Sequence, residues 1–202
     1  TLFRSEIGDA VTFTLCVEIM AKHSNIILVG SDGVILDAVK RIDFTQSSVR
    51  QILPGFKYEL PPKQDKLNVT ECDIQAVVEE IKKRSGKRLS AAVLDTVEGA
   101  SPLISREIAA FACGGDTAVD ELTPIALQRL EAKLGEIKEM LLGEGAEPTM
   151  LLRDGVKPYD FTFMDITQYG FAVTPKRFGS FSELLDDFYY EKDRFERTRQ
   201  RS

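Results

Sequence analysis

The chain opens with alternating apolar and polar side chains. Apolar residues occupy every second position from 11 to 19, while Thr12, Thr14 and Glu18 fall on the other side. A period of two is typical of a strand that is buried on one face only. The pattern therefore predicts a half-buried strand over residues 11–20.

Two further apolar runs follow, separated by a turn. Residues 26–29 form a continuous run of mostly β-branched side chains, which is typical of a strand covered on both faces. Residues 30–33 include two glycines, which tolerate positive φ, and residues 34–36 are apolar again. Together with the first strand, these runs predict a three-stranded meander.

The period of two then stops, and helical spacing starts near residue 70. Residues 43–69 are polar and interrupted by prolines, which predicts a long ordered loop. Thr70 and Asp73 resemble a capping box for a first helix that ends near residue 86. Three more helices are predicted to follow caps at Ser90, Ser101 and Thr123.

The end of the chain returns to a period of two and then to a helix. Residues 150–164 are predicted to form a hairpin around an Asp154-Gly155 turn. Ser180 and Glu183 form a capping box that opens a last helix, and the end of this helix is rich in arginine.

These patterns predict an α+β fold. We expect a mostly antiparallel sheet built from residues 11–60 and 147–173, interrupted by a helical insertion at residues 70–143. The predicted domains are residues 1–69, the first part of a β lobe; residues 70–145, a helical subdomain; residues 146–179, returning strands; and residues 180–202, the start of a long helix.

The composition is that of an ordinary globular protein, with 43% hydrophobic and 29% charged residues. The formal net charge of -6 argues against a polybasic surface, so any nucleic-acid contact must come from a local cluster. The three cysteines are far apart and form no CxxC motif, which favours a reducing compartment. No apolar run reaches the length of about 18 residues that spans a membrane. Because the chain starts at Thr1 without a methionine, we expect it to be an excised piece.

A single histidine, His23, limits the chemistry of the chain. Metal sites built from several histidines are excluded, and no nucleophile motif stands near His23. We therefore expect no catalysis, no metal and no cofactor. His23 falls in the predicted turn between the first two strands, where it either contacts a phosphate or ribose or bonds to neighbouring backbone.

Two clusters of cations offer further contacts. Lys63-Gln64-Asp65-Lys66 places two cations and an amide on the long loop, which suits phosphate and sugar contacts or simple solvation. The densest cluster joins residues 82–84 to residues 87–88 at the predicted end of a helix. Compensation of the helix dipole also explains cations at that position.

Five segments of the chain resemble a known family. They are EIMAKHSNIILV, SSVRQILPG, ELPPKQDKLN, GASPLISREIA and SELLDDFYYEKDRFERTRQRS. In this order they are similar to the NFACT-N region of the fibronectin-binding protein A / RqcH family, over nearly all of the chain. Related proteins commonly carry Gly-Arg before His-Ser-Asn, whereas this chain carries Ala21-Lys22, which keeps a positive charge but not the planar fork of arginine.

The resemblance implies a function in ribosome-associated quality control. By this resemblance the parent protein binds tRNA, alanyl-tRNA in particular, and the large ribosomal subunit carrying a stalled nascent chain. It supports C-terminal alanine tailing of that chain in the cytoplasm, without being an enzyme itself. The resemblance also implies a helix-two-turns-helix element around residues 99–102 and a coiled coil after the last helix. The Asp-Arg pair that the family uses for tRNA is expected upstream of Thr1.

Other classes remain open from the sequence. The older family name suggests a fibronectin-binding surface adhesion module, and a relation to DNA-repair glycosylases lacks lesion-processing residues. We also expect the chain to self-associate through the strand at residues 11–19 or through its last helix. The candidate RNA-binding residues are Glu18, Ile19, Met20, Lys22, His23, Ser24, Asn25, Arg50, Lys63, Gln64, Asp65 and Lys66.

Overall fold

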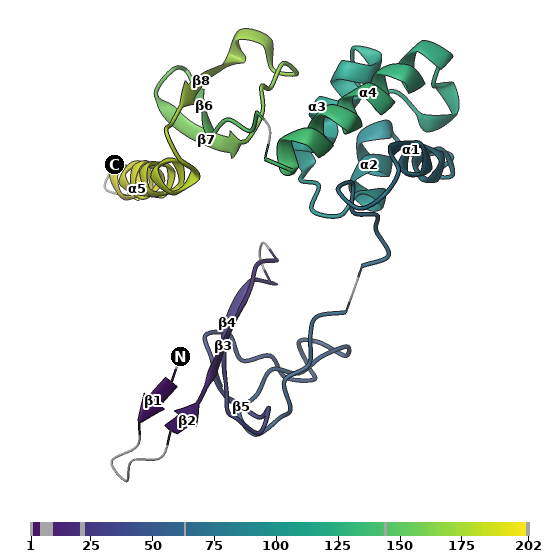
Figure 1. The fold of residues 1–202 in the computed structure, drawn as a ribbon. Helices are drawn as coiled ribbons and strands as arrows, with labels where there is room; N and C mark the ends of the chain where they lie inside the picture. The colour runs from purple at the N-terminus through teal and green to yellow at the C-terminus, as the bar shows by residue number, and fades with distance from the viewer. Residues whose placement is uncertain (1, 5–9, 21–22, 63, 144, 201–202) are drawn as a thin grey trace. The chain divides into compact units, whose positions relative to one another are not determined.

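A computed structural model describes residues 2–4, 10–20, 23–62, 64–143 and 145–200 of the chain (Figure 1). The chain divides into two compact units, Thr1–Lys63 and Gln64–Ser202. Each unit is described by itself below, as unit 1 and unit 2.

Unit 1 contains a small antiparallel sheet. The short strands β1 (Leu2–Arg4) and β2 (Ala10–Thr12) pair with each other, and β3 (Thr14–Glu18), β4 (Asn25–Val29) and β5 (Ile35–Ala38) form a sheet in the order β3-β4-β5. The predicted meander is therefore confirmed. The predicted strand over residues 11–20 is wrong in its extent, because strand geometry is interrupted at Phe13 and ends at Glu18.

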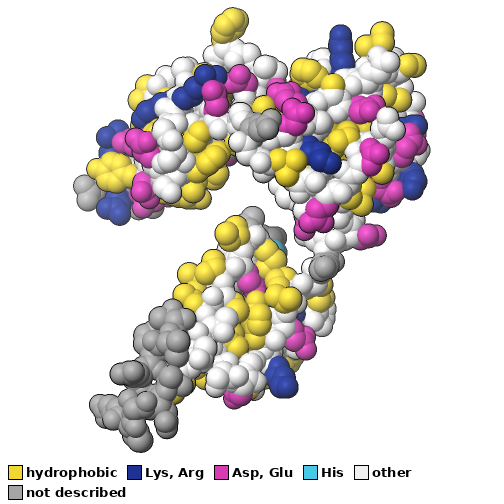
Figure 2. Space-filling view, in the orientation of Figure 1, with side chains coloured by type: hydrophobic (Ala, Val, Ile, Leu, Met, Phe, Trp, Pro, Cys, Tyr) yellow, Lys and Arg dark blue, Asp and Glu magenta, His cyan; other side chains and the backbone are white. Residues whose placement is uncertain are grey.

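The apolar row of β3 does not face the core of unit 1. Leu15 and Val17 are 63% and 60% exposed, whereas Glu18 is only 6% exposed. This reverses the expectation for a half-buried strand. The loop that follows β5 supplies the reason, since its side chains cover the face of the sheet that carries Glu18. Figure 2 shows hydrophobic side chains on the surface of unit 1, and the exposed apolar residues of the sheet include Leu15, Val17, Ile26, Leu36 and Val39.

The core of unit 1 is small. Four aliphatic side chains are buried together, with Cys16, Ala38, Ile42 and Tyr58 packed against them. An antiparallel bridge between Ile42 and Ile52 closes the loop after β5 on itself, and a second bridge joins Lys57 of this loop to Val34 beside β5. This part of the predicted long loop is therefore ordered by backbone pairing. The four buried side chains are Ile27, Val29, Ile35 and Ile52.

Unit 2 begins with helices that follow caps. The helices are α1 (Ile74–Lys82), α2 (Leu89–Thr96), α3 (Pro102–Cys113) and α4 (Pro124–Leu141), with the short η2 (Val119–Glu121) between α3 and α4. The predicted caps Ser101 and Thr123 are confirmed, since their side chains accept backbone N–H groups and a proline follows each of them. Gly114 ends α3 in the left-handed conformation, with φ 71°.

The other two predicted caps are wrong. Asp73 caps α1 by accepting the N–H of Gln75, and Thr70 instead bonds to Asn68. Ser90 lies inside α2, where its hydroxyl bonds to Asp116. In both places the hydroxyl donates to another polar side chain, Asn68 two residues before Thr70 and Asp116 far along the chain from Ser90. The four helices enclose a core of buried aliphatic side chains, among them Val77, Ile81, Val93, Ile108, Leu130 and Leu134.

The second part of unit 2 is a three-stranded sheet covered by a helix. The strands β6 (Thr149–Arg153), β7 (Lys157–Thr162) and β8 (Val173–Arg177) pair antiparallel in the order β7-β6-β8, and η3 (Gly170–Ala172) precedes β8. The predicted hairpin is confirmed, and Asp154 and Gly155 both take positive φ in its turn.

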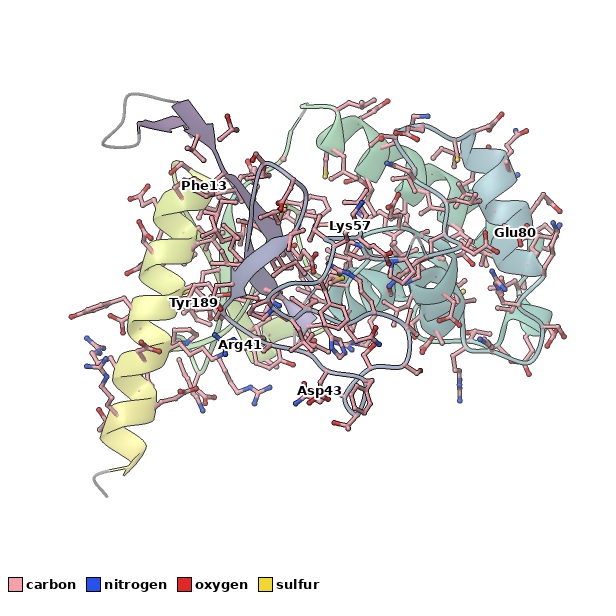
Figure 3. The ribbon with its side chains drawn as sticks, turned by 90° about the horizontal axis from the view of Figure 1, so that it is seen from below. Phe13, Arg41, Asp43, Lys57, Glu80 and Tyr189 are labelled. Atoms are coloured by element: carbon pink, nitrogen blue, oxygen red, sulfur yellow. The ribbon has the colours of Figure 1, made fainter. Side chains whose placement is uncertain are left out.

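Helix α5 (Phe181–Gln200) packs on this sheet through Leu184 and Phe188, which meet Met150 and Phe161. The predicted cap Ser180 is confirmed, since its hydroxyl accepts the N–H of Glu183 over 3.2 Å. Figure 3 shows Tyr189 on the same helix.

The mixture of helices and antiparallel strands makes the fold α+β, as predicted. The prediction of one sheet from residues 11–60 and 147–173 is wrong, because the described strands form separate sheets in the two units. Strands β3, β4 and β5 pair only among themselves, as do β6, β7 and β8, so no described strand of one segment bonds to a strand of the other.

Candidate functional site

The candidate site is the turn that joins β3 to β4, residues 19–24. Two hydrogen bonds close it: the N–H of His23 donates to the carbonyl oxygen of Met20 over 2.9 Å, and the N–H of Met20 donates to Ser24 Oγ over 2.9 Å. Ser24 is half-buried and serves the turn as an internal acceptor. These bonds join the two described ends of the turn, residues 19–20 and 23–24, to each other.

Three side chains of this turn lie open to solvent. Ile19 is 88% exposed, Met20 is 37% exposed, and His23 is exposed as well. Aliphatic groups beside an imidazole can contact the face of a base or sugar while the ring bonds to a phosphate or hydroxyl. Lys22, which the sequence also predicts here, lies outside the described residues.

The residue before the turn, Glu18, belongs to a buried ionic cluster. Glu18 ends β3, and its carboxylate accepts hydrogen bonds from both terminal nitrogens of Arg50, with Nη1 to Oε2 at 3.1 Å and a shorter bond from Nη2 to Oε1. The hydroxyl of Tyr58 donates to the same carboxylate over 3.0 Å. The guanidinium of Arg50 also lies 5.3 Å from the centre of the Tyr58 ring. We call these three residues the Glu18 brace.

The brace changes the pKa of Arg50 and of Tyr58. The hydrogen bond to Glu18 raises the pKa of Arg50 above its ordinary value, which keeps the guanidinium charged. Burial, followed by the hydrogen bond to the Glu18 carboxylate, raises the pKa of Tyr58 far above its ordinary value. At physiological pH, Glu18 therefore faces a charged guanidinium and a neutral phenol.

The residue after the turn is the buried Asn25, which pairs with Glu18 across the two strands. Its side-chain NH2 donates to the carbonyl of Lys40 over 2.8 Å, and its side-chain oxygen accepts the N–H groups of Lys40 and Ile26. Asn25 thus ties the start of β4 to the segment after β5. The residues on either side of the turn, Glu18 and Asn25, are thus buried polar residues whose side chains are hydrogen-bonded.

The remaining predicted residues are the last residue of unit 1, Lys63, and the first three of unit 2, Gln64, Asp65 and Lys66. Lys63 lies outside the described residues, Gln64 and Asp65 are exposed, and Lys66 is half-buried. Leu67 ties this segment to the α2–α3 connection, since its N–H donates to the carbonyl of Thr96 over 2.7 Å. The candidate residues therefore fall into two groups, one in each unit.

Four of the five cations in the basic cluster near α1 pair with carboxylates, and the fifth, Arg88, donates to the backbone carbonyl of Asp116. Lys82 and Lys83 bond to Glu79 and Glu80 one turn earlier, at 2.8 and 2.6 Å. Figure 3 shows Glu80 on α1. Lys87 pairs with Asp95, eight residues further along the chain. These cations therefore have carboxylate partners in addition to the helix dipole.

Sequence reasoning missed Tyr58 and Lys40. Tyr58 sits in a polar loop with no periodicity, and Lys40 contributes its backbone and not its side chain. No local pattern marks either residue, because both act on partners far away in the sequence. The order of charged residues alone does not show that Glu18 and Arg50 meet.

A metal site or a groove elsewhere in the described residues would be an alternative to this turn. No group of three or more histidine, cysteine, aspartate or glutamate side chains among them could hold a metal ion. An open groove of about 890 Å³ between β8 and α5 carries both signs of charge. Its charges pair across or beside the groove, as in the 2.7 Å contact of Lys176 with Asp187.

The architecture is that of a two-unit α+β domain in which a small sheet carries a braced turn. Residues 2–202 match the family model described as NFACT N-terminal and middle domains. The chain therefore belongs to the NFACT family, as the resemblance predicted.

Relatives of known name support this assignment. The chain is 35% identical over 200 residues to the Rqc2 homolog RqcH of Bacillus subtilis (strain 168), an alignment that covers 98% of this chain and 32% of the relative. It is 53% identical over 66 residues to the Rqc2 homolog RqcH of Streptococcus suis (strain 05ZYH33), covering 32% of this chain and 12% of the relative. The chain thus spans about a third of the length of the first of these proteins.

Solved structures show the same fold. The fibrinogen binding protein from Staphylococcus aureus superposes with a TM-score of 0.70 at 28% identity, covering 93% of this chain and 63% of that one. The N-terminal part of the fibronectin/fibrinogen-binding protein from Streptococcus suis gives a TM-score of 0.60 at 26% identity, covering 95% and 61%. Among the described residues, no helix has the length and apolar character needed to cross a membrane.

Proposed function

We propose that this chain is an RNA-binding module of a ribosome-associated quality control factor. Its partners are tRNA, alanyl-tRNA in particular, and the large ribosomal subunit with a stalled nascent chain. The family and the 35% identity to an Rqc2 homolog over 98% of the chain support this assignment. The observation that carries it is the turn at residues 19–24, which presents His23 beside two exposed aliphatic side chains.

The turn suits RNA for physical reasons. An imidazole can bond to a phosphate oxygen or a ribose hydroxyl, and the 2′-hydroxyl distinguishes RNA from DNA. Ile19 and Met20 supply apolar contact area to a base or sugar. Because Met20 already bonds to His23 and Ser24, less ordering entropy is lost at these residues when RNA binds.

In this proposal the chain binds and positions tRNA, and the ribosome supplies the chemistry of alanine tailing. The chain needs no cofactor and no metal for that role, and it acts in the cytoplasm. The α2–α3 pair serves as the helix-two-turns-helix element within a helical subdomain of residues 70–145. Helix α5 leads into a coiled coil.

Crosslinking tests the proposal directly. RNA bound to the full-length protein in cells is crosslinked and sequenced, and we expect strong enrichment of tRNA, with alanine tRNA foremost. His23→Ala is the matched variant and should reduce the enrichment without changing the melting temperature. Recovery of background RNA alone by the unaltered protein would remove the proposed function.

A second candidate is a fibronectin-binding surface adhesion module. The names of two solved relatives favour it, and the exposed apolar face of the β3-β4-β5 sheet offers contact area for a protein. Surface plasmon resonance on immobilised fibronectin separates the two candidates. Saturable binding that Val17→Thr weakens and His23→Ala leaves intact would support adhesion, and absence of saturable binding would exclude it.

A further inference from the structure

We propose that Arg50 and Tyr58 are positioning residues for the RNA-binding turn and that the Glu18 brace acts on RNA only through the backbone of that turn. This inference rests on the proposed function. It assigns to Glu18 and Arg50 a role different from direct contact with RNA.

The carboxylate of Glu18 accepts hydrogen bonds from side chains of unit 1. Its two carboxylate oxygens accept from Arg50, and one of them also accepts from Tyr58. The Glu18 side chain is only 4% exposed. A carboxylate in this position cannot reach a ligand without losing the pair that compensates its burial.

Arg50 is engaged in the same way. Both terminal nitrogens of its guanidinium point to Glu18, and its side chain is 10% exposed. A phosphate contact by Arg50 would require the guanidinium to leave a buried carboxylate. The planar fork of arginine matches a carboxylate in two parallel bonds, so the pair fixes an orientation as well as a distance.

The brace transmits this orientation to the turn. Glu18 is the last residue of β3, so the chain enters the turn at Ile19 directly from the braced residue. Arg50 and Tyr58 lie 32 and 40 residues further along the chain. The loop after β5 thus fixes the direction in which Ile19, Met20 and His23 are presented, and Asn25 fixes the exit of the turn.

The salt dependence of tRNA affinity distinguishes a positioning residue from a residue that contacts a phosphate. A cation that neutralises a phosphate releases counterions, so removing it lowers the slope of log affinity against log salt by about one. A positioning residue neutralises no phosphate. Its loss weakens binding at every salt concentration and leaves the slope unchanged.

The test measures binding of purified alanine tRNA to the full-length protein by fluorescence anisotropy, from about 50 to about 200 mM salt. Arg50→Gln should weaken binding roughly tenfold with an unchanged slope. Tyr58→Phe, which removes one hydroxyl, should weaken it several-fold and should accelerate amide hydrogen exchange at Met20 and His23. Arg41→Gln is the charge-matched control, since Arg41 makes an exposed pair with Asp37 and should leave binding nearly unchanged.

Each outcome decides a separate question. A slope that falls by about one in Arg50→Gln would show a direct phosphate contact and overturn the positioning role. If Arg50→Gln fails to fold, Tyr58→Phe with unchanged affinity and unchanged amide exchange overturns it equally. Failure of the unaltered protein to bind tRNA overturns the proposed function, and the positioning role with it. Binding that both variants leave intact overturns the positioning role alone.

Discussion

Two buried carboxylates, one in each unit, stabilise their surroundings by different means. Glu18 of unit 1 is held by the side chains of Arg50 and Tyr58. Glu107 of unit 2 is 1% exposed and accepts the backbone N–H groups of Thr167 and Gln168 as well as the hydroxyl of Thr167. Glu18 pairs with the charged side chain of Arg50 from a distant loop, whereas Glu107 accepts backbone N–H groups from the segment at residues 167–168.

The surroundings explain the difference. Glu107 lies on α3, within a unit whose helices bury a large aliphatic core. Glu18 lies beside a core of four buried aliphatic side chains. A small core supplies little hydrophobic stabilisation, so polar partners determine which conformation the loop and turn of unit 1 adopt. Such a unit suits a binding site, because its geometry is specific although its core is small.

The largest expected effect comes from breaking the ionic brace on one side. Glu18→Leu leaves the guanidinium of Arg50 buried and unpaired, and we expect the free energy of unfolding of unit 1 to fall by about 3 to 5 kcal/mol. Combining it with Arg50→Met removes the orphaned charge and should recover most of the loss. Urea unfolding measures both variants. A double variant as unstable as Glu18→Leu would show that the pair is not the source of the cost.

Glu107 should respond differently, since no single second substitution can remove its partners. Glu107→Gln replaces one acceptor oxygen by an NH2 group that faces a backbone N–H, and we expect a loss of about 2 kcal/mol. Glu80→Gln, in an exposed pair with Lys83 on α1, is the control and should stay within about 0.5 kcal/mol. Equal effects in the two variants would mean that the backbone bonds to Glu107 contribute little.

A smaller effect is expected from the phenol of the brace. Tyr58→Phe removes one hydrogen bond, and we expect a loss on the order of 1 kcal/mol near neutral pH. The pKa of Tyr58 is raised in the folded state, so its stabilising contribution is fully present below about pH 10, where the unfolded phenol is also neutral. Above that pH the unfolded state releases the proton first, and the contribution is lost as the pH rises.

Urea unfolding between about pH 8 and about pH 11 checks this sign. The unaltered protein should lose stability above about pH 10 more steeply than Tyr58→Phe does. Tyr190→Phe, on the exposed part of α5, is the control for general alkaline effects. Parallel curves for the unaltered protein and Tyr58→Phe would contradict the raised pKa.

Local patterns in the sequence predicted the elements but not their surroundings. The caps at Ser101 and Thr123 and the Asp154-Gly155 turn are found as predicted, because each depends on residues within a few positions. The burial of Glu18 depends on Arg50 and Tyr58, which lie 32 and 40 residues further along the chain, and no local period encodes it. The sequence predicts candidate RNA-binding residues in the turn after β3, but no local signal points to Tyr58, whose hydroxyl bonds to Glu18 at the start of that turn.

The smallest expected effect concerns the apolar row of β3, where sequence pattern and structure disagree most. If Val17 faced a core, Val17→Thr would bury a hydroxyl without a partner and cost roughly 1 to 3 kcal/mol. Val17 is 60% exposed, so we expect a change within about 0.5 kcal/mol. Ile27→Thr on the neighbouring strand, where Ile27 is fully buried, is the matched control and should show the larger cost.

The same variant tests self-association, because an exposed apolar sheet face beside an open strand edge favours contact with a second copy. Light scattering over a concentration series should show association that Val17→Thr reduces. Leu15→Pro should reduce it further if the route is edge pairing, since proline removes a backbone donor from the strand. A loss of stability in Val17→Thr as large as that in Ile27→Thr would place the apolar row in a core and restore the original interpretation of the pattern. Association that persists unchanged in both β3 variants would instead assign it to α5.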